Sequence, residues 1–394
     1  MISISTLYCG NALSSHDLRY GSGAGRPGPV TVFNCTMRCN LRCRHCYSSN
    51  PIAGGELTTQ EAETLIDELA GLGTPVILFS GGEPVMRQDL GELMAYAAGH
   101  GIRSTISTNG TLITPAIARQ FADIGVGYVG ISIDGLKRTH DAFRHKVGSF
   151  EQALSGIANC QAEGLKVGLR MTLTAYNVNE IGGVFDLMAQ RGIPRICFYH
   201  LVYTGRGSDI RDADLPAPRR REAIDLILDR TAASHRGGRP VEVLTVDNHC
   251  DGPYLYMRLL REDPHRAEQA LALLKANGGN ASGVRLVCVK SNGDVYPDQF
   301  WQTQLLGNIR VRPFSRIWND PDNRLLADLR RRPRPLVGPR CSKCKWLAVC
   351  NGNFRARAEA TTGVWGDDPA CYLTDQEIGL TQPATRQPAA TPTE

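Results

Sequence analysis

The sequence contains no hydrophobic run long enough to cross a membrane. Its most apolar segments, such as "TPVILF" and "VGYVGISI", are far shorter than the roughly 20 residues that a spanning helix needs. The N-terminus also lacks the basic block and the apolar block of a signal peptide. We therefore expect no membrane partner and no export, which makes a reducing cytoplasm the expected location.

A strong net charge is missing as well, since the 394 residues carry a formal charge of only +5. The basic residues gather in "APRRREAI" and "LADLRRRPRPLVGPRCSKCK", but no aromatic platform or recognition motif accompanies these runs. We expect no nucleic-acid partner. The basic runs either form a solvated face or meet an anionic small substrate.

Cysteine, by contrast, is abundant, with 13 residues. Because disulfides are rare in the cytosol, clustered cysteines there more often bind metal or take part in redox chemistry. Seven of the cysteines fall into two groups in this chain. The others are expected to be small buried apolar side chains, and they are Cys9, Cys35, Cys160, Cys197, Cys250 and Cys288.

Short apolar runs alternate with amphipathic stretches from about residue 30. Alternation of this kind favours parallel strands with helical crossovers, so we predict an α/β fold. Six such units fit either an open doubly wound sheet or an incomplete (β/α) barrel. The predicted strands are residues 29–33, 75–80, 103–108, 127–134, 166–174 and 195–202.

The carboxyl ends of the parallel strands carry the chemistry in both architectures. A polar or glycine-bearing segment follows every predicted strand. These segments are the cysteine-rich "NCTMRCNLRCRHCYSSN", "SGGEP", "STNG", "SIDG", a strand end with Arg170, Thr172 and Thr174, and "HLVYTGRG". One of them alone would be an ordinary turn. Six at the same edge of a sheet predict a shared site.

Cys39, Cys43 and Cys46 have the spacing C-x3-C-x2-C on the loop after the first strand. Zinc would normally need four ligands, and His45 is too close in sequence to complete a standard pairing. Iron–sulfur clusters are held by thiolates on such compact loops. Three ligands would leave one iron of a cubane cluster open to a small molecule. Cys35 falls outside the triplet and is expected to be a bystander.

This triplet resembles the signature of the radical S-adenosylmethionine (SAM) superfamily. The resemblance implies a partial (β/α)6 TIM barrel, in which the open iron binds SAM and a 5′-deoxyadenosyl radical abstracts hydrogen from the substrate. It also implies groups that contact the amino group, ribose, carboxylate and adenine of SAM. In this sequence they are Gly81, Gly82 and Glu83 for the amino group, Ser132 and Asp134 for the ribose, Arg170 for the carboxylate and His45 for adenine.

The second cysteine group has the spacing C-x2-C-x5-C-x20-C and consists of Cys341, Cys344, Cys350 and Cys371. Four thiolates could hold structural zinc. The region resembles the small C-terminal auxiliary-cluster (SPASM/Twitch) domains of radical SAM enzymes. Those domains often carry two extra clusters, but Asp298 stands here where the longer pattern has cysteine. We therefore expect one auxiliary 4Fe-4S cluster, which makes two 4Fe-4S clusters in the chain beside SAM.

These patterns divide the chain into five predicted parts. They are an N-terminal extension at residues 1–28, the partial barrel at 29–235, a bridging region at 236–285, the auxiliary domain at 286–381 and a disordered Pro/Thr/Ala tail at 382–394.

Several further stretches narrow the resemblance. "VLTVDNHCDGPYLY", "VYPDQFW" and "CKWLAVCNGNFRARAEA" resemble the radical SAM proteins of tetrapyrrole biosynthesis. The resemblance implies 12,18-didecarboxysiroheme as the substrate and a flavodoxin or ferredoxin as the electron donor. Deacetylation to iron-coproporphyrin III in siroheme-dependent heme biosynthesis is the expected reaction, and propionate removal in heme d1 biosynthesis is the alternative.

Such a substrate is flat, anionic and iron-bearing, which suits arginine for its carboxylates and imidazole for its iron. His200, Tyr203, Arg206 and His249 are the candidate substrate contacts. We hypothesise that His200 or His249 ligates or orients the iron.

Two competing functions follow from the same motifs. A peptide-modifying radical SAM enzyme could carry the same auxiliary domain. Such proteins often carry a leader-peptide-binding domain before the barrel, and the roughly 28 residues before the first strand count against this alternative. A non-catalytic iron–sulfur electron carrier or zinc protein is the other class, and the "GGEP" and "SID" segments count against it.

Overall fold

The computed structural model describes residues 1–10, 20, 28–50 and 53–380. The predicted tail at 382–394 lies outside these residues. The strands of the described residues are β1 (Ile2–Ser3), β2 (Val30–Thr36), β3 (Val76–Gly81), β4 (Arg103–Thr108), β5 (Tyr128–Ser132), β6 (Val167–Leu173), β7 (Arg195–His200), β8 (Glu242–Val246), β9 (Leu286–Lys290), β10 (Asp294–Tyr296) and β11 (Gly307–Asn308).

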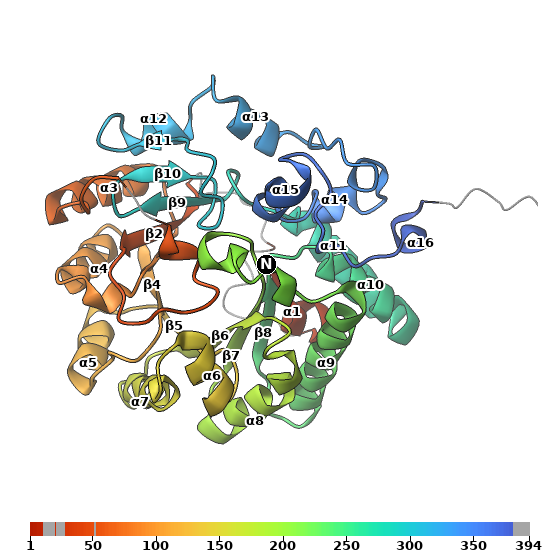
Figure 1. Cartoon of the computed structure of the whole chain (residues 1–394), viewed down its shortest axis with the longest axis horizontal. Helices are drawn as coiled ribbons and strands as arrows, with labels where there is room; N and C mark the ends of the chain where they lie inside the picture. Colours follow the sequence, from red (N-terminus) through yellow and green to blue (C-terminus); the bar gives the residue numbers. More distant parts are fainter. Residues whose placement is uncertain (11–19, 21–27, 51–52, 381–394) are drawn as a thin grey trace, which may run out of the picture.

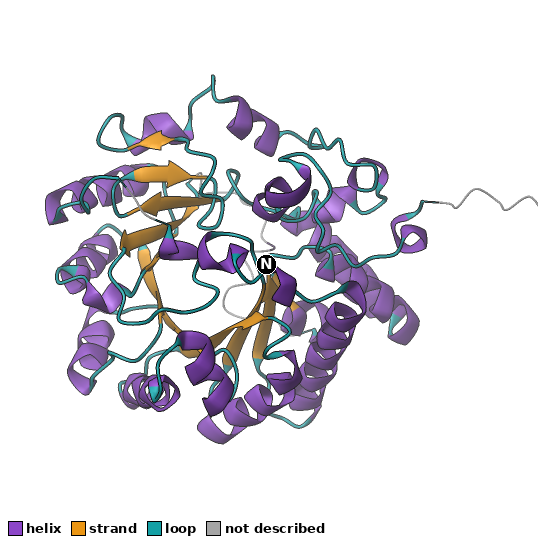
Figure 2. Cartoon of the chain, viewed as in Figure 1, coloured by secondary structure: helices purple, strands orange, loops and turns teal. Residues whose placement is uncertain are grey.

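Within the described residues these strands form one eleven-stranded sheet, in the order β1-β8-β7-β6-β5-β4-β3-β2-β9-β10-β11. Strands β2 to β9 run parallel to one another, while β1 pairs antiparallel with β8, β10 with β9 and β11 with β10. The sheet curves around a central space, with helices along its outer side (Figure 1; Figure 2). This is an open, barrel-like arrangement.

The six helices that pack outside the parallel strands are α3 (Thr59–Gly71), α4 (Leu90–Gly99), α5 (Pro115–Ile124), α7 (Ser149–Ala162), α8 (Ile181–Arg191) and α9 (Ala217–Arg236), counted within the described chain. The short helix α6 (Lys137–Arg144) packs against α7. Local sequence explains several of their starts. Thr58 and Glu61 form a capping box before α3, and Thr114 caps α5 with Pro115 in its first turn. One large core lies between these helices and the sheet.

Strand β8 was not predicted, because the sequence analysis placed its residues in an irregular bridging region. It pairs in parallel with β7 and is therefore a seventh unit of the barrel. The strand is only five residues long, and the helix before it, α9, begins with the polar run "APRRRE" rather than an apolar stripe. The alternation that reveals the other units is hidden at this point of the sequence.

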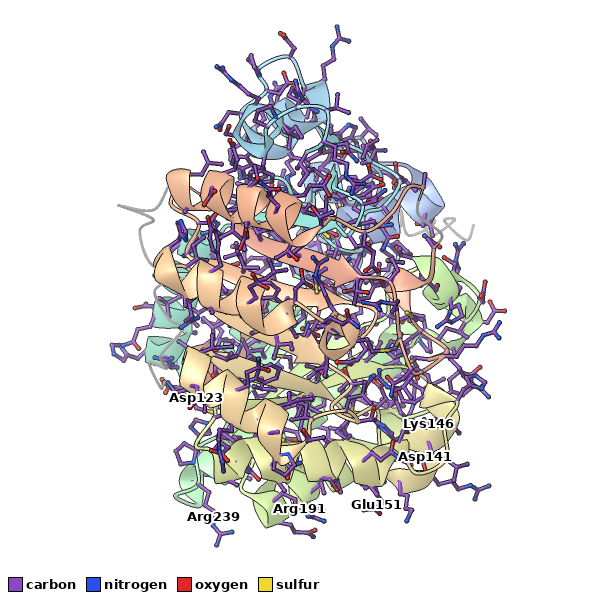
Figure 3. The ribbon with its side chains drawn as sticks, turned by 90° about the vertical axis from the view of Figure 1, so that its left-hand side faces the viewer. Asp123, Asp141, Lys146, Glu151, Arg191 and Arg239 are labelled. Carbon is purple, nitrogen blue, oxygen red and sulfur yellow. The ribbon has the colours of Figure 1, made fainter. Side chains whose placement is uncertain are left out.

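The C-terminal part extends the same sheet. Strand β9 pairs in parallel with β2, and β10 and β11 add a hairpin beyond it. The remaining helices of the described chain are α1 (Ile4–Cys9), α10 (Asp251–Glu262), α11 (Pro264–Asn277), α12 (Phe314–Trp318), α13 (Arg324–Arg330), α14 (Leu347–Cys350), α15 (Arg355–Thr362) and α16 (Asp375–Ile378). Figure 3 shows this part (blue) at the opposite end of the molecule from Arg191 and Arg239.

Each of the two basic runs contributes one buried arginine to the inside of the fold. Arg220 donates to the carbonyl of Ala370 at 2.8 Å and to Asp214 at 2.7 Å, and Arg334 donates to Asn280 and Asn351 at 3.0–3.1 Å. Both side chains are buried. Arg220 connects the C-terminal part to the barrel, and Arg334 connects segments within the C-terminal part. This structural role differs from the two expected roles of the runs, which were a solvated face and contact with an anionic small substrate. No described helix has the length and apolarity that crossing a membrane requires.

A buried ion pair strengthens the attachment of the C-terminal part. Arg357 donates to both oxygens of Asp368, at 2.8 and 2.9 Å, and neither side chain is exposed. The same guanidinium donates to the carbonyls of Leu201 at 3.0 Å and Asp247 at 2.7 Å. Because these carbonyls lie just beyond β7 and β8, one side chain joins two barrel strand ends to the auxiliary segment.

Candidate active site

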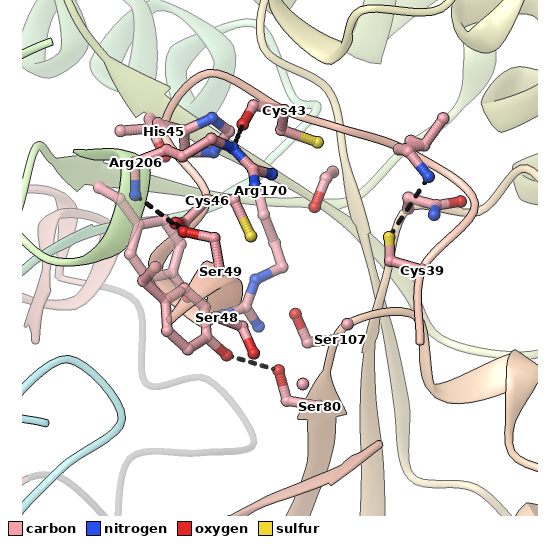
Figure 4. Close-up of a pocket in the computed structure, with 18 of the residues that line it drawn as sticks. Cys39, Cys43, His45, Cys46, Ser48, Ser49, Ser80, Ser107, Arg170 and Arg206 are labelled. Atoms are coloured by element: carbon pink, nitrogen blue, oxygen red, sulfur yellow. Dashed lines mark hydrogen bonds between the residues drawn. The ribbon is translucent and has the colours of Figure 1, made fainter. Parts of the chain in front are cut away.

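A cavity of about 450 Å³ opens at the carboxyl ends of the parallel strands. Its wall includes Cys39, Cys43 and Cys46, and Figure 4 shows their sulfur atoms turned toward the same space. The segments after β3, β4, β5 and β7 also contribute to the wall, together with side chains of β6. The shared site expected from six coincident strand ends is therefore present as one cavity.

Two glycines let the loop after β3 pack against the cysteine loop. A Cβ at Gly82 would lie 2.2 Å from the carbonyl oxygen of Arg38, and one at Gly81 would lie 2.3 Å from that of Thr36. Gly81 also has φ of 124°, which disfavours other residues. In this close approach the N–H of Gly82 donates to Thr36 at 2.8 Å. The "GG" of "GGEP" is thus required by backbone packing beside the thiols.

Arg206 holds the other side of the cysteine loop. Its backbone N–H donates to the carbonyl of Cys46 at 3.0 Å, and its Nε donates to the carbonyl of Cys43 at 2.8 Å (Figure 4). Ser49 Oγ accepts from the same backbone N–H at 2.9 Å. The cysteine loop is therefore held between the strand ends of β3 and β7 by these backbone and side-chain contacts.

The three thiols suit a cationic centre. Burial, together with the neighbouring thiols, raises the pKa of Cys39 to about 11, and burial followed by Cys43 raises the pKa of Cys46. Thiolates this crowded repel one another, so positive charge between them would favour their ionised form. Among the described residues no set of three or more cysteine, histidine or carboxylate side chains is close enough to hold a single metal ion.

Asp134 lies at the centre of a charged cluster beside the cysteines. Its Oδ2 is 2.5 Å from Arg144 and 3.8 Å from Nε2 of His45. Although burial opposes ionisation, Arg144 and His45 hold the pKa of Asp134 below its usual range. Burial lowers the pKa of His45 to about 4, so its ring is neutral near pH 7, and it stacks on Phe143 at 4.7 Å.

Arg144 was not predicted, although it donates to the sulfur of Cys43 at 3.4 Å and lines the cavity. It lies at the end of α6, more than 100 residues from Cys43 in sequence. No local motif marks it. The one hint in the sequence is that Arg144 ends the helix that follows "SIDG", which could place its side chain near the strand ends.

Arg170 contributes a second cation to the cavity wall. Its guanidinium lies over the ring of Tyr199 at 4.9 Å and forms no ion pair with any carboxylate of the described chain. Nδ1 of His45 is likewise buried without a hydrogen-bond partner in the part of the chain described. A half-buried cation without a carboxylate partner and an unpartnered ring nitrogen in one cavity suit an anionic ligand that also carries hydrogen-bonding groups.

The other residues predicted to contact SAM divide into two sets. Gly81, Gly82, Ser132, Asp134 and His45 line the cavity, as do the three cysteines and Arg170. Glu83 does not. Its carboxylate is fully buried and accepts hydrogen bonds from Thr108 at 2.6 Å and the N–H of Asn109 at 2.7 Å, so it joins the loops after β3 and β4.

The candidate substrate residues also divide. His200 and Arg206 line the cavity, whereas Tyr203 and His249 do not. The hydroxyl of Tyr203 donates to Asp214 at 2.7 Å, and the backbone N–H of buried His249 donates to Asn353 at 2.5 Å. His200 Nε2 lies 2.9 Å from the buried carboxylate of Asp251. Cys35 is fully buried and donates to the carbonyl of Ser80, away from the cavity wall.

The second cysteine group is gathered on α14 and the loops around it. Burial comes first among the causes that raise the pKa of Cys350, followed by Cys371, Cys341 and Cys344, which shows that the four thiols are neighbours. Asp298 has other partners, since its Oδ1 accepts from the N–H groups of Phe300 and Trp301 at 2.8 and 2.9 Å. An all-thiol set of four suits an iron–sulfur cluster.

Comparison with known proteins decides the family. The radical SAM superfamily model matches residues 33–188, and the model of an iron–sulfur cluster-binding domain, SPASM, matches residues 282–345. Fe-coproporphyrin III synthase of Methanosarcina barkeri is 53% identical to this chain, over 96% of this chain and 99% of the relative. The chain belongs to the radical SAM superfamily.

Two further comparisons refine the placement. Pre-heme d1 synthase of Dinoroseobacter shibae is 43% identical over 90% of this chain and 89% of the relative. The crystal structure of Streptococcus suis SuiB bound to precursor peptide SuiA has the same fold, with a TM-score of 0.71 and 16% identity over 88% of this chain and 76% of SuiB. Within the superfamily, the chain falls in the tetrapyrrole-modifying family that contains the two synthases.

Membership confirms the predicted architecture and cofactors. The chain has the α/β fold of a radical SAM partial barrel with a C-terminal auxiliary iron–sulfur segment. It is an enzyme whose cofactors are SAM and 4Fe-4S clusters, one in the barrel and one in the SPASM segment. The residues present fit these groups, since the three thiols of the first set line one cavity and the four thiols of the second set are neighbours.

Proposed function

We propose that this radical SAM enzyme removes two acetate side chains from 12,18-didecarboxysiroheme to give iron-coproporphyrin III in siroheme-dependent heme biosynthesis. The observation that carries the proposal is the 53% identity, over nearly the whole of both chains, with a protein named Fe-coproporphyrin III synthase. The cavity supports it, because its cations, Arg144, Arg170 and Arg206, suit an anionic substrate and SAM together. Mass spectrometry of the product tests it.

Propionate removal in heme d1 biosynthesis is the second candidate. It is favoured by the 43% identity with pre-heme d1 synthase. The two reactions use the same substrate and differ in the mass lost, so the same experiment separates them. A low-potential flavodoxin or ferredoxin is the proposed electron donor, and the cytoplasm is the proposed location.

Each of the two thiol sets is proposed to ligate one iron–sulfur cluster. Cys39, Cys43 and Cys46 hold the cluster that binds SAM, and the four C-terminal cysteines hold the auxiliary cluster. When bound, the first cluster and SAM supply the radical that takes a hydrogen atom from the substrate. The chain orients the two reactants: Gly81 and Gly82 shape the floor beside the cysteines, Asp134 and Ser132 face the ribose, and His45 lies beside the adenine.

Arg170 is proposed to pair with the carboxylate of SAM. We expect Arg170→Met to weaken SAM binding by roughly 10- to 100-fold, since a hydrogen bond to a charged group contributes about 1.5–3 kcal/mol. Anaerobic equilibrium binding of SAM to the reconstituted protein measures this.

Arg195→Met is the matched control. Arg195 lies on β7 over Tyr128 at 4.3 Å and does not line the cavity, so SAM affinity should be unchanged. Equal losses in the two variants would contradict the assignment of Arg170.

His200 is proposed to meet the iron of the substrate. Although burial opposes ionisation, the neighbouring His200 holds the pKa of Asp251 below its usual range. The carboxylate of Asp251 is therefore ionised and accepts a hydrogen bond from Nε2 of His200. Nδ1 is then left as the nitrogen with a free lone pair. His200→Ala should change the absorption spectrum of the bound iron tetrapyrrole and weaken its binding by roughly tenfold or more, the loss of about one ligand or charged hydrogen bond.

His249→Ala is the comparison variant, because His249 is buried outside the cavity wall. It should leave the spectrum of the bound substrate as in the wild type. A spectrum unchanged in His200→Ala, or changed only in His249→Ala, would remove His200 from the proposal.

A further inference from the structure

The four residues Asn248–Asp251, just after β8, connect the cavity to the auxiliary cysteines. Asn248 donates to the carbonyl of Ala370 at 3.0 Å, and the hydroxyl of Tyr372 donates to Asp251 at 2.8 Å. The two contacts therefore lie on either side of Cys371 in sequence. Asp251 also accepts from His200 in the cavity wall. The segment after β8 is therefore hydrogen-bonded to the loop that carries Cys371.

Cys250, in the middle of this segment, has no role in the function proposed so far. Its side chain is 1% exposed. Its sulfur lies 4.0 Å from the carbonyl oxygen of Ala370, next to Cys371. Burial and then the neighbouring Cys371 side chain raise the pKa of Cys250 well above its usual range. The sulfur of Cys250 also reaches Oδ1 of Asn248 at 3.0 Å. A fifth thiol, contributed by the barrel, therefore borders the four auxiliary thiols.

The single S–H proton of Cys250 has three acceptors in reach, which are the carbonyl of Ala370, Oδ1 of Asn248 and the sulfur of Cys371. The carbonyl of Ala370 is distant at 4.0 Å and already accepts from the side chains of Arg220 and Asn248. Oδ1 of Asn248 already accepts from the side chain of Asn353 at 2.7 Å. A cluster-bound thiolate at Cys371 would carry negative charge, and hydrogen bonds to ionised acceptors are roughly twice as strong as neutral ones. With the cluster in place, the proton of Cys250 therefore favours the sulfur of Cys371.

We propose that Cys250 is a tuning residue of the auxiliary centre, donating an S–H hydrogen bond to the Cys371 sulfur and raising the reduction potential of the cluster. This rests on the proposed assignment of Cys371 as a cluster ligand. Hydrogen bonds to cluster sulfurs are among the factors that set the potential. The effect is large in a buried, low-dielectric place such as this one. Through Asp251, the same segment links the cluster to His200 in the cavity.

The test is a redox titration of the auxiliary cluster, followed by electron paramagnetic resonance, in the full-length chain with Cys39, Cys43 and Cys46 replaced by alanine. In that background the auxiliary cluster is the one that remains to be titrated. Cys250→Ala and Cys250→Val, which lack a donor, should shift its potential to more negative values. Cys250→Ser keeps a donor and should stay closest to the parent. Cys250→Val also fills the thiol's volume, which guards against loss of packing in Cys250→Ala.

Cys160→Ala is the matched control, because Cys160 is an equally buried thiol on α7. The reduction potential of the auxiliary cluster in the Cys160→Ala variant should equal that of the parent. The proposal is overturned if the donor-free variants titrate with the parent, or if Cys250→Ser shifts as far as they do. Absence of any cluster from the parent protein would instead refute the ligand assignment of the four C-terminal cysteines, so the two failures are distinguishable.

Discussion

Replacing Cys39, Cys43 or Cys46 with alanine should reduce SAM cleavage to the level seen without enzyme. Each supplies one of three sulfurs that line a single cavity, and a cluster held at three corners has no spare protein ligand. Loss of one sulfur also removes the open iron at which SAM is proposed to bind. The measurement is 5′-deoxyadenosine formed by the anaerobically reconstituted protein with SAM and a strong reductant.

Cys35→Ala supplies the control, because Cys35 is fully buried, donates to the carbonyl of Ser80 and does not line the cavity. It should retain most of the wild-type cleavage. Substantial 5′-deoxyadenosine from any of the three ligand variants would contradict the assignment, as would complete loss in Cys35→Ala with the iron content preserved.

Asp368→Asn should destabilise the fold by about 3–5 kcal/mol, since it leaves a fully buried guanidinium without its counter-charge. Arg357 and Asp368 are both completely shielded from solvent, and Arg357 also binds two carbonyls at the ends of β7 and β8. The loss should therefore loosen the auxiliary segment from the barrel. Anaerobic urea denaturation of the cluster-loaded protein measures it as a lower midpoint.

Glu61→Gln is the matched control, because it breaks an ion pair that is exposed rather than buried. Glu61 pairs with Arg310 at 2.6 Å, and both side chains are about one-third exposed. Exposed ion pairs contribute only about 0–1 kcal/mol, so the midpoint should hardly move. Similar shifts in the two variants would show that burial of the Arg357–Asp368 pair does not have the proposed importance.

The features that could be predicted from the sequence are those set by local patterns. The thiol spacing and the alternation of the first six strands each follow from neighbouring residues, whereas the packing of Gly81 and Gly82 against the cysteine loop appears only in the structure. The residues that could not be predicted act through tertiary contacts. Arg144 reaches Cys43 across about 100 residues of sequence, and no neighbouring motif marks it.

Two further differences have the same origin. Strand β8 is short and follows a polar helix, so its membership of the sheet appears only through its pairing with β7. Tyr203 and His249 were expected in the substrate site because their side chains suit the carboxylates and the iron of a tetrapyrrole. Their side chains or backbone are bound instead to Asp214 and Asn353, outside the cavity wall. Position at a strand end fixes the neighbourhood of a residue, but side-chain partners decide which way it faces.

The central claim is tested most directly by anaerobic incubation of the reconstituted enzyme with SAM, a reductant and 12,18-didecarboxysiroheme, followed by mass spectrometry of the tetrapyrrole. The proposal predicts loss of two acetate side chains and formation of iron-coproporphyrin III, with 5′-deoxyadenosine as co-product. Loss of propionates would contradict the deacetylation, and an unchanged tetrapyrrole beside cleaved SAM would contradict the proposed substrate.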